Sequence, residues 1–306
     1  MKKYNILLAI LILYIIINMV IYPQIYINQT LNGISAWAFN VLPSILPFIF
    51  FTKILTMTGM VENVSRLFMK PCKKLFNTPA ISAYVFLTSA ISGYPVGAKM
   101  TSDLYCQGKI TKNDAFKMTS FCSTSGPMFI IGAVGIGMLK NALYGYIIFI
   151  AHILGAIING ICYKKLKIKD DNKKNSQEGN QQNGDLSSMV LDSALSVISV
   201  GVIIAIFFVV ITSLSPIFNL FPLPISSVLE GLIEITRGCI DISSSITSVW
   251  SIAACSFIIS FGGISTILQS LTMLNKLNMP IWLFALQKFT HAIIASIISI
   301  IFIALI

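Results

Sequence analysis

The chain has 306 residues, of which 56% are hydrophobic and only 10% are charged, with a formal net charge of +10. Soluble domains are about a quarter charged, so this composition excludes an ordinary soluble protein and predicts an all-α polytopic membrane protein. Its length suits roughly seven to ten spans or half-spans of about 20 residues. The positive charge does not indicate nucleic-acid binding, because the lysines lie in short polar gaps between apolar runs, as in cytoplasmic loops.

The N-terminal region, residues 1–34, predicts one transmembrane helix and an external loop. Met1-Lys2-Lys3 precedes an apolar run from Ile6 to Ile21, which is similar to a signal peptide. The run is long, however, and bulky residues stand where a cleavage site needs small ones. We therefore expect a retained helix at 4–21 with its N-terminus in the cytoplasm, and an external polar stretch at 24–32.

Residues 35–163 form the next predicted unit, in which apolar runs are interrupted by helix-breaking residues. Prolines inside a span kink it, and Ser92-Gly93-Tyr94-Pro95-Val96-Gly97 cannot continue a helix. Each half of the run around this segment is too short to span a bilayer, which predicts a re-entrant hairpin. The expected elements are a kinked span at 35–58, a cytoplasmic surface helix at 61–78, the hairpin at 80–106, a broken span at 115–139 and a span at 143–162.

A polar, Asn/Gln/Lys-rich segment at 164–187 predicts a flexible cytoplasmic linker before the last unit, residues 188–306. This unit repeats the order of span, amphipathic helix, broken hairpin and long span. The expected elements are a span at 189–214, an external loop with three prolines, an amphipathic helix at 228–242, a second hairpin at 250–274 broken at 261–263, and a span at 281–306.

The two halves therefore predict an internal repeat. An ungapped register pairs Ser92 with Ser260 and Phe121 with Phe289, although identity is low. The lysine loops orient the first span of each half in opposite directions. We expect two inverted-topology repeats with re-entrant hairpins and broken helices, an architecture typical of transporters.

The first hairpin tip carries the chemistry of an anion site. Its glycines allow close backbone approach, and the half-helix that begins near Val96 presents unpaired N–H groups and a positive dipole end. Lys99 in the first turn adds a full charge, although it could instead extend to the membrane interface. The candidate binding residues here are Ser92, Gly93, Tyr94, Pro95, Gly97 and Lys99.

Two further breaks contribute candidate residues. The hydroxyl groups at 123–125 could bind a ligand, or they could satisfy carbonyls released by Pro127. Gln269 lies one turn beyond Ser265, where it could bind a polar substrate or a neighbouring helix. The candidates are Ser123, Thr124, Ser125 and Gly126 in one break, and Phe261, Gly262, Gly263, Ser265 and Gln269 in the other.

Three ionisable residues are candidates for ion or proton coupling. Glu230 and Glu234 share a helix face, which fits a cation site or simply the polar face of a surface helix. His291 lies in an apolar span, as does His152, and neither has a carboxylate three or four residues away. For both histidines an interhelical hydrogen bond competes with a proton relay.

No enzyme motif stands out. The sequence contains no P-loop, no H-E-x-x-H and no dinucleotide fingerprint, and the Ser–Gly pairs lack the glycine of a G-x-S-G hydrolase motif. We therefore expect no enzymatic activity, no cofactor, no metal site and no nucleic-acid partner.

Several segments together resemble one family. Ile91–Lys99 resembles the SGYP-x-GAK signature of the YlbJ (SpoVV) type of sporulation integral membrane proteins, and Thr124–Gly135 resembles that family's second motif. Leu229–Thr236 and Ser260–Gly263 fit its C-terminal half more weakly. The family belongs to a gate, or nucleoside-recognition, group related in architecture to concentrative nucleoside transporters.

The resemblance implies a transporter that carries dipicolinic acid, a small dianion, across the outer forespore membrane of an endospore-forming bacterium. It leaves two alternatives: a membrane scaffold for spore maturation that acts through the 164–187 linker, and a transporter of a nucleoside-like solute. The expected partners are a small anionic metabolite, the lipid bilayer, and either a second copy of the chain or other sporulation membrane proteins.

Overall fold

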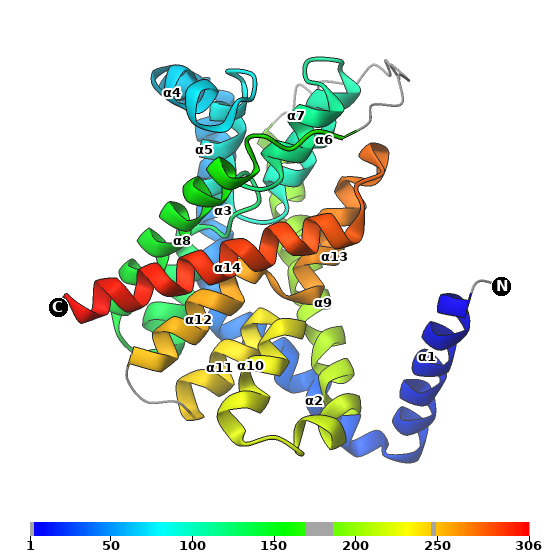
Figure 1. Ribbon diagram of the computed structural model, residues 1–306. Helices are drawn as coiled ribbons and strands as arrows, with labels where there is room; N and C mark the ends of the chain where they lie inside the picture. Colours follow the sequence, from blue (N-terminus) through cyan, green and yellow to red (C-terminus); the bar gives the residue numbers. More distant parts are fainter. Residues whose placement is uncertain (1–2, 169–185, 246–248, 306) are drawn as a thin grey trace.

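The computed structural model describes residues 3–168, 186–245 and 249–305, and within these ranges the chain is helical and contains no strand (Figure 1). The elements of the first half are α1 (Lys3–Ile21), α2 (Pro23–Ala36), η1 (Trp37–Val41), α3 (Leu42–Met57), α4 (Met60–Phe76), α5 (Ser82–Ser92), α6 (Val96–Cys106), α7 (Lys112–Met118), η2 (Met128–Met138) and α8 (Ala142–Tyr163). Those of the second half are α9 (Leu186–Phe218), α10 (Leu223–Ile233), α11 (Ile235–Ser245), α12 (Val249–Phe261), α13 (Gly263–Met273), η3 (Asn275–Leu277) and α14 (Ile281–Ala304).

Four stretches of the described chain are long and apolar enough to cross a membrane: Ala142–Tyr163, Val197–Phe218, Trp250–Met273 and Ile281–Ala304. The bent pair α1–α2 would make a fifth. Large apolar side chains also face outward, among them Phe39 at 80% exposure and Trp282 at 68%, and only lipid covers such surface favourably. The all-α membrane architecture predicted from composition is therefore confirmed, and the protein is an integral membrane protein.

The N-terminal region differs from the prediction. Residues 24–32, expected to be an external loop, are helical within α2, which bends from α1 by about 107° and packs against α9. Gly33 makes this contact close, because a Cβ there would lie 2.8 Å from the Ala205 Cα. Pro23 suits the first turn of α2, where its missing N–H has no intrahelical partner.

The helical break predicted at 92–97 is present, while the re-entrant course of the first hairpin stays a prediction. α5 and α6 pack against each other on either side of a break at residues 93–95, where Gly93 has a φ of +80°. Only glycine adopts this conformation without strain. The next predicted span is also broken, and more widely than expected, since residues 119–127 separate α7 from η2.

The second hairpin lies elsewhere than predicted. α12 and α13 continue as one candidate span across Gly262, so the prediction of a hairpin tip at 261–263 was wrong. Instead, α10 and α11 fold back on each other around Glu234, in the segment expected to be a surface helix. Their closest approach needs glycine on both helices, because a Cβ on Gly238 would overlap the Gly231 Cα.

The two hairpins lie at opposite ends of the bundle, with α5–α6 in the upper part of Figure 1 and α10–α11 in the lower part. The long helices α8, α12 and α14 pack together between them. Each half thus contains a hairpin, then a broken helix, then a long helix, while the inverted relation of the halves stays a prediction. Most of the predicted linker, residues 169–185, lies outside the described residues.

Candidate functional site

The first hairpin tip lies directly against the break that follows α7. A Cβ on Gly93 would lie 2.8 Å from the Gly126 backbone nitrogen, and a Cβ on Gly97 would overlap the Cys122 carbonyl oxygen. Ser89 on α5 joins the same contact, because its hydroxyl bonds the Thr124 hydroxyl at 2.9 Å and accepts from the Thr124 N–H. The segment Ser92–Pro95 and the segment 123–127 therefore form one structural unit, although α6 and α7 separate them in the sequence.

Side chains from α8 and α14 satisfy the backbone groups of this break. Asn159 donates to the Ser120 carbonyl at 2.8 Å, and Gln287 donates to the Phe116 carbonyl at 2.8 Å. All are buried, and unpaired backbone groups at membrane depth would be costly. The non-helical segment is thus held in place by buried side chains of two neighbouring helices.

His152 on α8 links the break to α12. Its Nε2 accepts the Ser125 N–H at 2.9 Å, and its Nδ1 lies 2.7 Å from the Ser260 hydroxyl. Because a backbone N–H can only donate, Nε2 carries no proton and Nδ1–H donates to Ser260. His291 in turn donates from Nε2 to the His152 carbonyl at 2.9 Å. Both histidines therefore make interhelical hydrogen bonds, which was one of the two roles that the sequence left open for them.

Lys288 is a residue that the sequence reasoning missed. It lies on α14 with only 3% of its surface exposed. Its ammonium donates to the Ser123 carbonyl at 2.8 Å and to the Tyr94 hydroxyl at 2.5 Å, and it lies 4.6 Å from the centre of the Tyr94 ring. The signal was available, because Lys288 is the single charged residue in the apolar sequence of α14.

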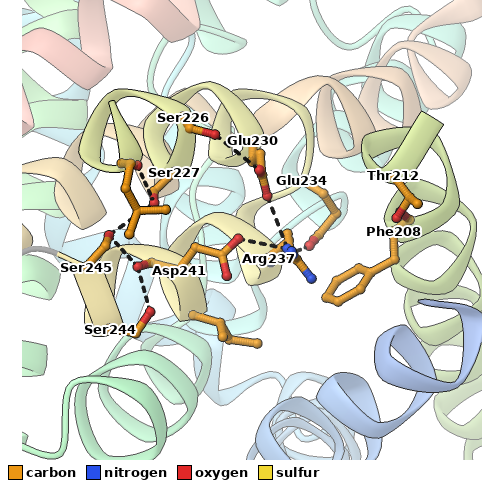
Figure 2. A network of polar contacts seen from close by, with 12 residues as sticks. Phe208, Thr212, Ser226, Ser227, Glu230, Glu234, Arg237, Asp241, Ser244 and Ser245 are labelled. Carbon is orange, nitrogen blue, oxygen red and sulfur yellow. Dashed lines mark hydrogen bonds and ion pairs between the residues drawn. The ribbon is translucent and has the colours of Figure 1, made fainter. Parts of the chain in front are cut away.

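The second hairpin is held together by an ionic network, shown in Figure 2. Arg237 on α11 pairs through Nε with Glu230 of α10 at 3.1 Å and with Asp241 at 2.7 Å. Its guanidinium also lies 5.4 Å from the centre of the Phe208 ring on α9. Glu230 therefore forms an ion pair within the hairpin, and its role in ion or proton coupling stays a prediction.

Glu234 occupies the turn of the same hairpin and is only 3% exposed. Its carboxylate accepts the Arg237 backbone N–H at 2.7 Å, so it caps the start of α11. Glu234 lies outside the candidate spans, and burial raises the pKa of its carboxyl to about 7, although hydrogen bonds from Arg237 and Thr236 oppose this shift.

A cavity of about 100 Å³ lies where these broken elements meet. Drug-sized ligands need pockets of about 300 Å³ or more, so this cavity suits a smaller solute. It is lined by apolar residues of α3 and α9, by polar residues at or beside the breaks at 93–95, 119–127 and Glu234, and by polar residues of α13. The polar and glycine lining consists of Ser92, Gly93, Tyr94, Ser125, Gly126, Glu234, Thr236, Ser265, Thr266 and Gln269.

The structure therefore brings together half of the predicted binding residues and separates the rest. Ser123 and Thr124 lie behind the lining in the same break, and Pro95 and Gly97 support the first hairpin. Lys99 is exposed on α6 and does not line the cavity. Phe261, Gly262 and Gly263 also lie outside the lining, as do Glu230 and His291.

Several helices begin beside the cavity. Four of them, α6, η2, α11 and α13, begin within a few residues of its lining. A helix start carries a partial positive charge, and at α11 the Glu234 carboxylate already accepts the Arg237 N–H. No group of three or more His, Cys, Asp or Glu residues suited to a metal ion occurs in the described part of the chain.

Comparisons with known proteins find sequences similar to this chain. Residues 38–142, which include the first hairpin and the break after α7, match the family model described as Gate: Nucleoside recognition. The chain is 31% identical over 170 residues to the sporulation integral membrane protein YlbJ of Bacillus subtilis (strain 168). That match covers 56% of this chain and 42% of the relative's length. No solved structure matches.

Proposed function

We propose that the protein is a secondary transporter or facilitator that moves a small organic anion, dipicolinic acid, across the outer forespore membrane of a spore-forming bacterium. The cavity is the observation that carries the proposal. It lies where the broken elements meet, and the starts of α6, η2 and α13 beside it carry partial positive charge that would attract an anion. In secondary transporters, half-helix N-termini point at anionic substrate groups in the same way.

The similarities support the membrane and sporulation parts of the proposal. The related protein is named a sporulation integral membrane protein, and the family model is named for recognition and gating. The choice of dipicolinate as the solute comes from the resemblance of Ile91–Lys99 and Thr124–Gly135 to the YlbJ-type motifs, and its two carboxylates fit the helix starts.

Uptake of radiolabelled dipicolinate into proteoliposomes tests the proposal. Wild-type protein is compared with Thr266→Trp, which places a large side chain in the lining, and with Thr272→Trp, the same change on the exposed face of α13. We expect saturable uptake in the wild type and Thr272→Trp, and its loss in Thr266→Trp. Lys99→Ala should retain most uptake, because its side chain lies outside the cavity.

Two other outcomes identify the alternatives. The family model's description names nucleosides, so unlabelled nucleosides are added as competitors. Competition by nucleosides, with dipicolinate itself bound weakly, would identify a nucleoside-like solute. Uptake no faster than in empty liposomes, from folded protein, would favour a membrane scaffold, in which case deletion of 169–185 should abolish function in sporulating cells.

A further inference from the structure

Lys288 is a buried lysine without an acidic partner among the described residues. The ion pairs found in the described ranges belong to Arg237. The Lys288 ammonium is instead bound by oxygen atoms of neutral groups, the Ser123 carbonyl and the Tyr94 hydroxyl. An ammonium is expensive to bury, by several kcal/mol, even when it is hydrogen-bonded.

Two neighbouring side chains show that a neutral group can donate the hydrogen bond that a buried backbone carbonyl needs. Gln287, next in the chain, donates to the Phe116 carbonyl, and Asn159 donates to the Ser120 carbonyl. Both side chains are neutral and fully buried. Because a neutral amide suffices for the nearby Phe116 and Ser120 carbonyls, the presence of a lysine at position 288 points to a function.

The position of the Lys288 ammonium group also points to a function. It joins the first hairpin, through Tyr94, to the break after α7, through Ser123. A Cβ on Gly262 would lie 3.4 Å from the Lys288 Cε, so the break between α12 and α13 is adjacent as well. The Ser123 hydroxyl is also buried and makes no hydrogen bond within the described chain.

Carbonyl and hydroxyl oxygens at a broken helix are the groups that bind the coupling Na⁺ or H⁺ in secondary transporters. We propose that Lys288 is a tethered cation at such a site, and that its ammonium holds the first hairpin and the broken helices together in place of a free monovalent ion. The proposal takes its location from the transport site above, but it does not depend on which solute is carried.

Removal of the side chain should therefore open the site to a free cation. We expect Lys288→Ala, purified in detergent, to melt at a lower temperature than the wild type. Added Na⁺, K⁺ or ethylammonium should raise its Tm by at least about 2 °C over choline at equal ionic strength. The wild type and Lys276→Ala, a change at an exposed lysine, should show no such difference.

Lys288→Gln separates charge from hydrogen bonding, because glutamine can still donate to the Ser123 carbonyl. We expect its uptake to fall about tenfold or more, as for the loss of one charged hydrogen bond. Wild-type stability and uptake in Lys288→Gln, or a Lys288→Ala protein that responds to no small cation, would overturn the proposal. If Lys288→Ala does not fold, the glutamine variant still decides the role of the charge.

Discussion

At the scale of single residues, Glu234 is the most informative member of the cavity lining. Its carboxyl group lines the cavity, where it would face a bound solute. An ionised carboxylate would repel an anionic solute, whereas a neutral one would not. Since burial raises its pKa to about 7, its charge changes near neutral pH.

This charge change predicts a pH dependence. Protonated Glu234 favours anion binding, so binding should strengthen as the pH falls through the raised pKa, from about 8 to about 6. In Glu234→Gln the site stays neutral, and we expect dipicolinate binding to be nearly flat over the same range. Isothermal titration at several pH values measures both. An unchanged pH profile in the variant would show that another group titrates.

Gly97 predicts a stability effect at the contact between the first hairpin and the break. The methyl group of Gly97→Ala would overlap the Cys122 carbonyl oxygen, which belongs to the backbone and cannot rotate away. We expect a loss of about 1–3 kcal/mol, as for overpacked cores, seen as a lower Tm. Gly137→Ala is the matched control, because its nearest atom would lie at 3.4 Å. Equal Tm values for the two variants would contradict the close contact.

At the scale of elements, the α10–α11 hairpin is held by charges as well as by packing. Arg237 pairs with both Glu230 and Asp241, and the three side chains are between 12% and 29% exposed (Figure 2). The Gly231–Gly238 contact brings the two helices close enough for this network to form. The hairpin therefore behaves as one preformed unit that presents Glu234 to the cavity.

Removal of Arg237 should destabilise this hairpin. Arg237→Leu leaves two partly buried carboxylates facing each other, and we expect a loss of about 1–2 kcal/mol after solvent screening. Adding Glu230→Gln and Asp241→Asn should recover most of it. Thermal melting of the three proteins measures the effect, with exposed Arg66→Leu as the control. A triple variant as unstable as Arg237→Leu would mean that packing, rather than charge, holds the hairpin.

At the scale of the whole molecule, the two hairpins converge on one cavity from opposite ends of the bundle (Figure 1). Neither hairpin alone encloses a solute, because the lining also needs α3, α9 and α13. Alternating access would follow if each hairpin closed the cavity from its own side, as in transporters built from inverted repeats.

This arrangement predicts opposite sidedness for two loops. In a Cys106→Ser, Cys162→Ser background, Lys109→Cys beyond the first hairpin should react with impermeant maleimide from the cytoplasmic side, and Leu220→Cys before the second hairpin from the other side. Both positions are exposed. Labelling of both from the same side of inside-out vesicles would rule out the inverted orientation.

The sequence by itself determined the all-helical membrane class, the long spans and the break at Ser92–Gly97, because hydropathy and glycine–proline content act locally. It also named as candidates eight of the ten polar and glycine residues that line the cavity. It misplaced the second hairpin, since the glycine break at Gly262 and the acidic turn at Glu234 are both weak local signals. Only the helix-to-helix contact at Gly231 and Gly238 decides which segment folds back.

Only the tertiary structure shows which lysine is buried among the broken helices. Lys99 and Lys288 both lie in predicted membrane segments, and the sequence pattern does not show which of the two is buried. Packing leaves Lys99 exposed on α6 and buries Lys288 against Tyr94 and Ser123, which come from distant segments. The physical reason is that burial and charge partners are properties of contacts between elements, whereas a sequence pattern reports the tendencies of each element separately.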